Sequence, residues 1–367
     1  YQKNILIIFG VIKMNQKTKM QQTAEFGSDW WNDSNDHVEL QHAYNEGAVG
    51  ATSNPVITLN SVKNHPKTWL PVIDKLIASN HAASEDEVLW LLMDQVGKRA
   101  ANILLPVYHD TKRKKGKLSI QVNPKYYRNA DAMFEQGKYL ASLAPNIAIK
   151  CPALPAGIEA MEKLTSHGIS INATVSFSVS QTIQVAEAVE RGIAFANDKG
   201  IDITNLTPYV TIMVGRIDDH LKRKKEENNI DVSSELIDWA SIAIFKNAYN
   251  IFQERGYNSK LLAAAFRCDL HWSEIVGGDV IISMPYDWWN RFNNSKIDVE
   301  NKINIPVDKK IIGTLKENFE DFNKAYHENG MGINDFESFG PTKHTMKTFL
   351  LGYDEFANIV RDRMINK

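Results

Sequence analysis

Lys150 is the residue whose position points most directly to chemistry. It lies inside the apolar run NIAIKCP, directly before Cys151 and Pro152. Burial disfavours the charged ammonium form, so the pKa of such an amine falls and more of it is a neutral nucleophile. A neutral amine beside a carbonyl can form a Schiff base. The alternative is a lysine at a strand end paired with a carboxylate, and the strand by itself favours that alternative.

Two arginines could bind an anionic group. Arg216 follows the run PYVTIMVG, and Arg267 ends the run KLLAAAFR. Two guanidinium groups that leave neighbouring strands suit a phosphate monoester, because each can form paired hydrogen bonds to its oxygens. The alternative is ordinary salt bridges, for Arg216 with Asp218 or Asp219. The two arginines together favour anion binding more than either does alone.

Short strand-like runs alternate with amphipathic helical runs from about residue 25 to 290. The eight predicted strands are 28–34, 49–54, 117–123, 146–152, 170–178, 208–215, 260–267 and 279–285. The helical runs between them carry end signals, such as a capping box at Ser84–Glu87 and Gly168 after the helix 156–167. This alternation predicts parallel strands joined by right-handed crossovers.

Two architectures fit this pattern, a closed (β/α)8 barrel and an open doubly wound sheet. No glycine-rich phosphate-binding motif follows a strand, which weakens the open sheet without excluding it. Side chains alternate faces along a strand, and one face of several runs is repeatedly polar. Examples are Ser119, Gln121 and Asn123, and then Asn172 and Thr174. Because a central strand of an open sheet is almost continuously apolar, we predict an α/β TIM barrel with a polar mouth.

Polar residues recur at or near the C-terminal ends of the predicted strands. They are Asp33, Thr52, Asn54, Gln121, Lys150, Thr174 and Thr211. A single threonine in a strand usually reflects β-propensity alone, but recurrence at equivalent positions is harder to explain in that way. Catalytic groups of TIM barrels converge on this end of the barrel. We therefore expect the active site there.

The composition excludes several classes of protein. The 367 residues carry 42 Lys+Arg against 44 Asp+Glu, so the net charge is −2. General electrostatic binding to nucleic acid or to an anionic membrane is therefore not expected. Cys151 and Cys268 are too few for a disulfide framework, which favours a reducing, cytoplasmic compartment. The apolar run Ile5–Ile12 is far shorter than the roughly 20 residues of a membrane span.

We predict one domain with terminal extensions. Residues 1–22 are expected to be an N-terminal extension, either disordered or foreign to the native protein. Residues 23–307 are expected to form the barrel, and 308–367 a helical C-terminal extension packed on its outside. The basic runs Lys112–Lys117 and Lys222–Lys225 are interpreted as solvated turns rather than nucleic-acid contacts.

His271 with Glu274, and Cys151, are expected to support the fold rather than to take part in chemistry. His271 and Glu274 could bind a metal, but no further His or Cys supports such a site. A helix start with Trp272 packed inward is expected instead, and we predict no metal site. Cys151 is expected to face the helices as a small buried residue.

At these residues the sequence resembles the transaldolase family of Schiff-base aldolases. The similar segments are ATSNP (51–55), IKCPALPAGIEAMEKLTSHGISINATVSFSVSQ (149–181), VGRIDD (214–219) and AAFR (264–267). They occur in the family's order, and 149–181 is the most specific because it joins the lysine strand, its helix and the next strand. The resemblance implies a (β/α)8 barrel with the Schiff-base lysine on the fourth strand. The strand count places Lys150 there.

The resemblance also implies catalytic roles. Lys150 is similar to the Schiff-base lysine, and Asp33 to the aspartate that takes and returns the proton of the C4 hydroxyl. Thr174 is similar to the threonine that helps to hold the catalytic water. Gln121 stands where transaldolases carry a glutamate, and an amide can orient this water but cannot relay its protons. A long transaldolase-like subgroup is the most similar, through SIQVNP and CDLHWSEIVGGDVIIS-like segments.

Binding roles follow from the same resemblance. Its implied substrate-binding residues are Thr52, Asn54, Asn172, Thr211 and Met213, and its phosphate-binding residues are Arg216 and Arg267. Thr211 replaces the family's serine. Met213 stands where transaldolases have phenylalanine and where fructose-6-phosphate aldolases, which also carry the glutamine, have tyrosine.

The implied activity is transfer of a three-carbon dihydroxyacetone unit between sugar phosphates, as in the pentose phosphate pathway. Sedoheptulose 7-phosphate and glyceraldehyde 3-phosphate, or a related pair, would give erythrose 4-phosphate and fructose 6-phosphate. One alternative is a fructose-6-phosphate-type aldolase that releases dihydroxyacetone. Another is a catalytically weakened barrel that binds a sugar phosphate. The Schiff-base mechanism implies no cofactor, and dimers are common among relatives of this size.

Overall fold

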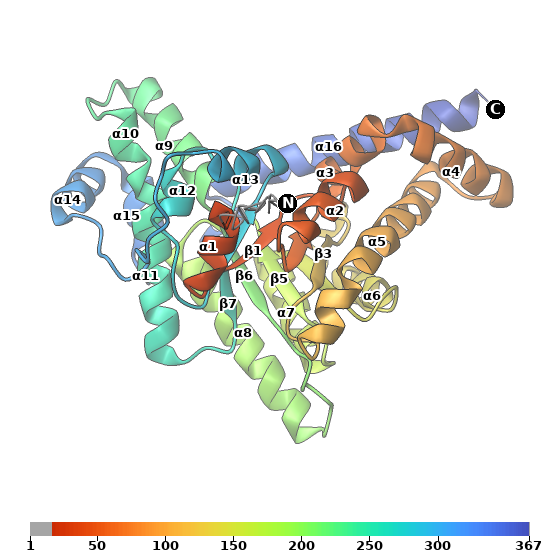
Figure 1. Cartoon of the computed structure of the whole chain (residues 1–367), viewed down its shortest axis with the longest axis horizontal. Coiled ribbons are helices and arrows are strands. Elements are labelled where there is room, and N and C mark those ends of the chain that lie inside the picture. Colours follow the sequence, from red (N-terminus) through yellow and green to blue (C-terminus); the bar gives the residue numbers. More distant parts are fainter. Residues whose placement is uncertain (1–16, 367) are drawn as a thin grey trace, which may run out of the picture.

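The computed structural model describes residues 17–366, and its centre is a closed barrel of parallel strands in chain order (Figure 1). The strands are β1 (Asp29–Asn32), β2 (Gly50–Thr52), β3 (Lys117–Gln121), β4 (Ile147–Pro152), β5 (Ile171–Thr174), β6 (Tyr209–Met213), β7 (Lys260–Ala264) and β8 (Ile281–Met284). The last strand pairs with the first, with Trp31 opposite Ser283. The predicted (β/α)8 barrel is confirmed, and the open sheet is excluded. The apolar run Ile5–Ile12 lies outside the described residues.

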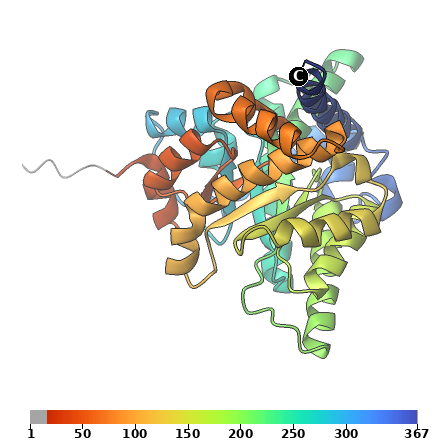
Figure 2. The same cartoon turned by 90° about the vertical axis from the view of Figure 1, so that its right-hand side faces the viewer.

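Helices surround the barrel and connect successive strands (Figure 1, Figure 2). Those between strands are α2 (His37–Asn45), α3 (Pro55–Asn64), α4 (Pro66–Ser79), α5 (Glu85–Asp110), η1 (Pro124–Tyr126), α6 (Ala130–Ala141), α7 (Pro155–Ser166), α8 (Val179–Asp198), α9 (Val214–Asn228), α10 (Ser234–Ile237), α11 (Trp239–Arg255) and α12 (Leu270–Ser273). The predicted capping box before α5 is present, because Ser84 and Glu87 cap each other's backbone N–H groups.

Further helices precede and follow the barrel. They are α1 (Lys19–Glu25), α13 (Tyr286–Asn293), α14 (Lys309–Asn318), α15 (Glu320–Tyr326), η2 (Ile333–Asp335) and α16 (Gly340–Ile365). Helix α1 begins inside the predicted N-terminal extension, and its Met20 is fully buried. Among residues 17–366, no helix is both long enough and apolar enough to cross a membrane.

Several strands end earlier than predicted. Strand β5 stops at Thr174 because Val175 adopts a positive φ of 54°, which is not a strand conformation. Ser178, predicted as the end of this strand, caps α8 by accepting a hydrogen bond from the backbone of Gln181. Strand β6 ends at Met213 and α9 begins at once. Short strands leave more residues in the loops of the barrel mouth.

Because β6 and β7 end early, the two arginines lie beyond the strands. Arg216 is in the first turn of α9 rather than at the end of a strand. Strand β7 ends at Ala264, and Ala265 has a positive φ of 65°, so Arg267 lies in the loop that follows. Both side chains therefore belong to the C-terminal rim of the barrel, where β6 and β7 are neighbours.

Apolar side chains close the lumen, most of them towards the N-terminal ends of the strands. This buried cluster contains Trp31, Ala148, Tyr209, Leu262 and Ile281, and it extends to Ala264 at the end of β7. The rings of Trp31 and Tyr209 meet edge to face with centroids 4.8 Å apart. On the outward face, Cys151 is fully buried in the core shared with the helices, as predicted, and burial raises the pKa of its thiol to about 12. The inward polar residues thus lie above an apolar floor.

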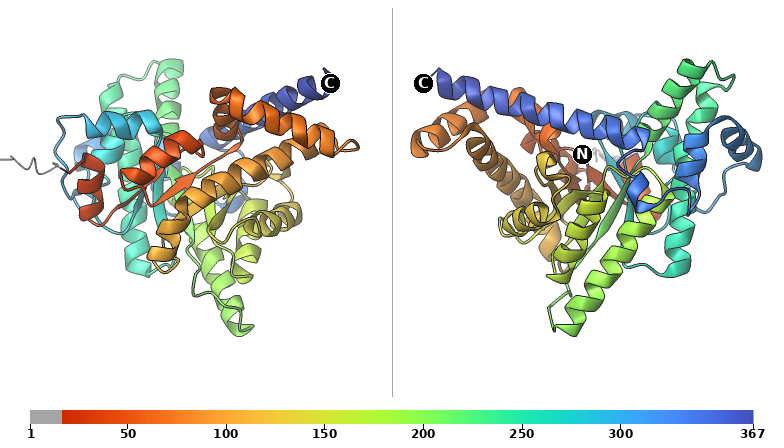
Figure 3. Two further views of the ribbon diagram at one scale, coloured as in Figure 1. Left: turned by 45° about the vertical axis from the view of Figure 1, so that its right-hand side comes forward. Right: turned by 180° about the vertical axis from the view of Figure 1, so that it is seen from behind.

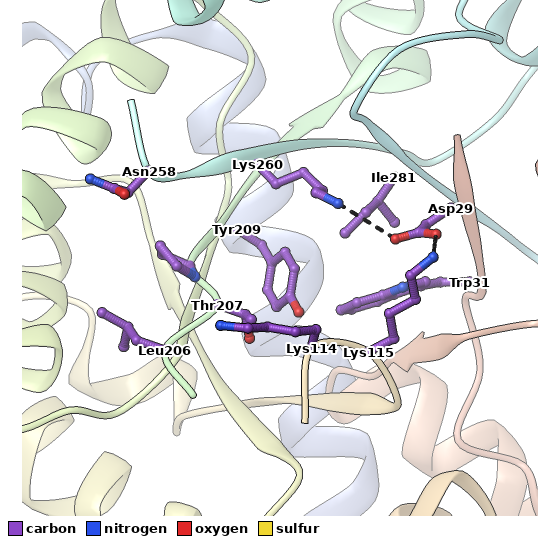
Figure 4. A pocket seen from close by; sticks show the side chains of 11 residues that line it. Asp29, Trp31, Lys114, Lys115, Leu206, Thr207, Tyr209, Asn258, Lys260 and Ile281 are labelled. Atoms are coloured by element: carbon purple, nitrogen blue, oxygen red, sulfur yellow. Dashed lines mark hydrogen bonds and ion pairs between the residues drawn. The ribbon is translucent and has the colours of Figure 1, made fainter. Parts of the chain in front are cut away.

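A cavity of about 210 Å³ lies below this floor, where Lys115 and Lys260 approach Asp29 (Figure 4). Their ammonium nitrogens are 2.5 and 3.5 Å from its carboxylate oxygens. The basic run 112–117 is therefore only partly a solvated turn. Lys117 is 3% exposed, packs its ammonium on the ring of Tyr108, and has a pKa lowered to about 8 by burial. The second basic run, 222–225, lies within helix α9 rather than in a turn.

Helix α16 runs along the C-terminal end of the barrel (Figure 3). It contacts α3, η1 and α9, each of which starts just after a strand ends, and it also packs on α5. Tyr353 fastens it there, because its hydroxyl donates a 2.7 Å hydrogen bond to Asp86 and accepts one from Trp90. The C-terminal extension is helical, as predicted, and it borders the mouth of the barrel.

Candidate active site

Strand β4 directs Lys150 into the barrel lumen. Its side chain is on the face opposite Ile149 and Cys151, and the residue is only 5% exposed. The amine lies 3.4 Å from the carbonyl oxygen of Ser53. Burial lowers the pKa of Lys150, and the negative charge of Asp33 partly opposes this effect. Within residues 17–366, no carboxylate lies within 4 Å of the amine, so the lysine is not the strand-end ion pair of the alternative interpretation.

Asp33 lies at the end of β1, held by the neighbouring strands. Its backbone N–H donates a 2.8 Å hydrogen bond to the carbonyl of Met284 on β8. The Thr52 hydroxyl donates to the carboxylate of Asp33 and also lies 3.0 Å from the hydroxyl of Ser283. Burial raises the pKa of Asp33, while the charge of Lys150 and the Thr52 hydrogen bond act in the opposite direction. A buried carboxyl with such neighbours can exchange a proton with a substrate hydroxyl.

Gln121 is the register partner of Lys150 across β3 and β4. It is 3% exposed, and its Oε1 atom is buried and accepts no hydrogen bond from any described residue. A buried acceptor without a donor costs about 1–3 kcal/mol. This carbonyl oxygen is thus suited to a donor that arrives with the reaction, such as a water or a substrate hydroxyl.

Thr174 and Met213 form the adjacent part of the lumen. The Thr174 hydroxyl lies 3.8 Å from the Met213 sulfur, which is a weak acceptor. Both residues are buried, on the neighbouring strands β5 and β6. A water could displace so weak a contact at little cost. The predicted water-holding role of Thr174 stays a prediction, which this geometry permits.

Asn172 and Thr211 lie in a hydrogen-bonded row that crosses three strands. The Asn172 amide donates to the Ser119 hydroxyl at 3.0 Å, and the Thr211 hydroxyl donates to the Asn172 carbonyl at 2.8 Å. All three residues are at most 2% exposed. Asn54 also has a local partner, because its side-chain oxygen caps α3 through the backbone of Ile57. Their predicted substrate contacts would use the remaining polar atoms.

The arginines of the rim differ in their partners. Arg267 is exposed, and its Nε donates a 3.0 Å hydrogen bond to Asp219. Arg216 is half-buried, and its Nε has no hydrogen-bond partner among the residues that the structure describes. Burial and the neighbouring positive charge of Arg267 lower the pKa of Arg216. Of the salt bridges considered for Arg216, Asp219 pairs with Arg267 and Asp218 pairs with His271.

Three residues near the site were absent from the predicted set. Ser283 on β8 contacts Thr52, and its single polar side chain in the run VIISMP was the available signal. His271 accepts a 3.0 Å hydrogen bond from the backbone of Arg267. His344 on α16 is close enough to the arginines that Arg223 and Arg216, after burial, lower its pKa. No sequence signal brings a histidine of the C-terminal helix to this rim.

Residues 30–335 match the model of the Transaldolase/Fructose-6-phosphate aldolase family. This match covers most of the chain and includes the strand residues described above whose side chains face the lumen. The chain belongs to this family. Family membership agrees with the resemblance found in the sequence.

Several curated relatives of this family member are named as transaldolases. It is 28% identical to Transaldolase 2 of Streptomyces coelicolor over 59% of the chain and 57% of that protein. It is 28% identical to the transaldolase of Thiobacillus denitrificans over 60% of the chain and 61% of the relative. The chain is 32% identical to the transaldolase of Campylobacter jejuni over 53% of its own length and 60% of the relative. The chain spans less than two thirds of the length of each of these relatives.

Proposed function

We propose that this protein transfers a dihydroxyacetone unit between sugar phosphates through a Schiff base on Lys150. The observation that carries the proposal is the environment of this lysine. Its amine is buried in the lumen, has a lowered pKa and no ion-pair partner among residues 17–366, and lies in the field of Asp33. Such an amine is a nucleophile at neutral pH, and the adjacent carboxyl can exchange protons with its substrate.

The first half-reaction cleaves the donor ketose. The Lys150 amine attacks the C2 carbonyl, and loss of water gives an iminium ion. Asp33 takes the proton of the C4 hydroxyl as the C3–C4 bond breaks, and an aldose phosphate leaves. The bonding electrons pass to the iminium nitrogen, so the remaining three carbons stay on Lys150 as an enamine. This nitrogen is the electron sink of the reaction.

The second half-reaction builds the product. Carbon C3 of the enamine attacks the aldehyde carbon of an acceptor, and Asp33 returns its proton to the new hydroxyl. Water then adds to C2 of the iminium ion and releases the ketose and the free amine. We assign the positioning of this water to Gln121 and Thr174. Oε1 of Gln121 has no hydrogen-bond partner in the described chain, and the Thr174 hydroxyl has the weak contact with the Met213 sulfur. Arg216 and Arg267 would hold the phosphate at the rim.

A second candidate is a fructose-6-phosphate-type aldolase. Gln121 favours it, because the fructose-6-phosphate aldolases that the sequence resembles also carry a glutamine at this position. In such an enzyme the enamine takes a proton at C3, and water releases dihydroxyacetone before an acceptor binds. The third alternative, a weakened sugar-phosphate-binding barrel, would keep the rim and lose the covalent step. All three candidates bind small sugar phosphates.

We also propose that the protein is cytoplasmic, because its two cysteines need no oxidising compartment.

Borohydride trapping tests the covalent step. The protein is incubated with dihydroxyacetone and borohydride, and the modified residue is located by peptide mass spectrometry. We expect a reduced three-carbon adduct on Lys150 that is absent from Lys150→Ala. A matched control is Lys117→Met. It removes another buried lysine with a lowered pKa, which stands at the N-terminal end of β3, away from the barrel mouth. This variant should keep the adduct. An unmodified Lys150 at high protein and ketone concentration would favour the binding barrel.

The products separate the two enzymatic candidates. With fructose 6-phosphate alone, an aldolase releases glyceraldehyde 3-phosphate and dihydroxyacetone continuously. With erythrose 4-phosphate added, a transaldolase makes sedoheptulose 7-phosphate and releases little dihydroxyacetone. The ratio of heptulose phosphate to free dihydroxyacetone therefore measures the balance between the two activities.

A further inference from the structure

A second cluster of chemically active side chains lies beside the loop that follows Asp33. Asp36, His37 and His65 place one carboxylate oxygen and two imidazole nitrogens within 4.8 Å of one another. Asp36 precedes helix α2 and His37 begins it, whereas His65 lies between α3 and α4. The imidazole rings of the two histidines are 4.8 Å apart, centroid to centroid.

The cluster has ligand atoms that no described residue outside it binds. Oδ1 of Asp36 caps α2 by accepting a 2.9 Å hydrogen bond from the backbone of Val38, and it also forms a 3.0 Å hydrogen bond with Nε2 of His65. Oδ2 lies 2.8 Å from the same nitrogen and accepts no other hydrogen bond in the described part of the chain, although the residue is only 1% exposed. Nδ1 of His37 is likewise buried without a partner among residues 17–366. Buried polar atoms of this kind normally have partners.

We propose that Asp36, His37 and His65 bind a divalent transition-metal ion, for which Zn²⁺ is the best-suited probe. Two imidazole nitrogens and one carboxylate oxygen are a common zinc donor set, with bonds of about 2.0–2.2 Å and a fourth position left for water. Ligand atoms of a tetrahedral site with such bonds are about 3.4 Å apart, inside the range spanned by the cluster. Small side-chain rotations would complete the geometry.

Charges of both signs surround the cluster. Arg99 interacts with His37 and would oppose a bound cation, whereas the carboxyl of Glu39 interacts with Asp36 and His65 and would favour one. A cavity of about 600 Å³, lined in part by His37 and Arg99, connects the cluster with solvent. An ion therefore has a route to the site.

A bound metal would tie together two segments that carry predicted active-site residues. Asp36 and His37 follow Asp33 along the chain, and His65 ends the helix that begins after Asn54. Asn35 already links these segments, because its amide donates to Thr58 at 2.8 Å and its carbonyl accepts from Ser61 at 3.0 Å. The metal would reinforce this link without touching the lumen, so it would raise stability rather than supply a reacting group.

The test uses the full chain after chelator treatment, titrated with Zn²⁺ by calorimetry and with Co²⁺ by visible absorption. We expect one ion per chain, cobalt bands typical of a four-coordinate nitrogen–oxygen site, and a rise in Tm of about 3 °C at saturating Zn²⁺. His37→Ala and His65→Ala should each weaken Zn²⁺ binding at least about tenfold. Asp36→Asn keeps an oxygen for the helix cap and should also weaken binding.

His109→Ala is the matched control, because His109 is an exposed histidine at the end of α5. It should leave Zn²⁺ binding unchanged. Absence of binding to the wild-type chain, or equal binding by His37→Ala, His65→Ala and wild type, overturns the proposal. Folding of each variant is checked by its Tm without metal. The outcome is independent of the Schiff base, since borohydride trapping on Lys150 requires none of these residues.

Discussion

Nε2 of His271 lies 2.7 Å from Oδ2 of Asp218, and both side chains are completely buried. The other ring nitrogen accepts a 3.0 Å hydrogen bond from the backbone N–H of Arg267, so the ring donates through Nε2 to the carboxylate. Asp218 also accepts hydrogen bonds from the backbone and the hydroxyl of Ser241. Asp218 follows Arg216 on α9. This buried pair therefore connects the segments that carry the two rim arginines.

His271→Ala should weaken binding of phosphorylated substrates. Removing the imidazole releases the backbone of Arg267 and leaves a buried carboxylate without one partner, which costs about 3–5 kcal/mol of stability. We expect KM for fructose 6-phosphate to rise about tenfold and Tm to fall, with little change in kcat. Steady-state kinetics with fructose 6-phosphate and with unphosphorylated fructose measures this. Equal losses with both sugars would show that His271 supports only the fold.

Gln121→Glu should raise transfer to erythrose 4-phosphate. A carboxylate at this position can relay protons through the water that adds to the iminium ion, whereas the amide can only orient it. Transfer is followed as sedoheptulose 7-phosphate formed per enzyme, with Gln121→Met as the control that removes the polar atoms. Turnover that is unchanged or lower in Gln121→Glu contradicts the view that the missing carboxylate limits the reaction.

Asp33→Asn should shift the pH dependence of Schiff-base formation to lower pH. The negative charge of Asp33 raises the pKa of Lys150 against the lowering effect of burial. Without that charge the pKa of Lys150 falls further, so the neutral amine appears at lower pH. Initial rates of borohydride trapping are measured against pH with dihydroxyacetone, which needs no C–C cleavage. A shift of the rising limb to higher pH would rule out this coupling.

Arg216→Ala and Arg267→Ala should each raise KM for phosphorylated substrates. A charge-assisted hydrogen bond contributes about 1.5–3 kcal/mol, or roughly 10–100-fold in KM. The larger effect is expected for Arg216, which is half-buried with a Nε that lacks a partner among residues 17–366. Arg191→Ala, which breaks an exposed pair with Glu162 on the outer helices, is the control. An unchanged KM in Arg216→Ala or Arg267→Ala would contradict a phosphate-binding role for that arginine.

Gly215→Ala should separate the two rim segments. A Cβ at this glycine would lie 2.1 Å from the carbonyl oxygen of Ala265 and 2.5 Å from Cγ of Arg267. The backbone N–H of Gly215 also donates to that carbonyl. We expect a lower Tm and a higher KM for sugar phosphates. Gly313→Ala is the control, because a Cβ there meets no atom within 4 Å, and in helix α14 it should stabilise by about 0.5–1 kcal/mol. A Gly215→Ala variant as stable and active as wild type would contradict this packing.

The barrel and most of its lumen residues could be predicted from the sequence because strand parity is local. Alternation along β3, β4 and β5 separates Gln121, Lys150 and Asn172 from the residues that face the helices. Strand ends were less predictable. The positive φ of Val175 and of Ala265 depends on how the following loops pack, and neither residue type predicts a positive φ.

Partnerships across the fold could not be predicted in this way. Asp218 and His271 meet at 2.7 Å although they stand on different barrel segments, so Asp218 is unavailable to Arg216. No metal site was predicted, because His271 and Glu274 had no further His or Cys to support one. No short motif joins His37 to His65 in the chain. Only the packing of α2 against the α3–α4 junction places them together.

The sequence by itself determined the alternation of strands and helices, the inward face of each strand and the lysine of the fourth strand. These depend on the period of side chains along a strand and on the order of motifs, which are properties of neighbouring residues. The tertiary structure decided which buried polar atoms pair and which do not. Gln121 Oε1 and Arg216 Nε lack partners in the described chain, whereas Thr211 and Asp218 have them. Pairing depends on distances of about 3 Å between strands and helices, and only the closed barrel sets those distances.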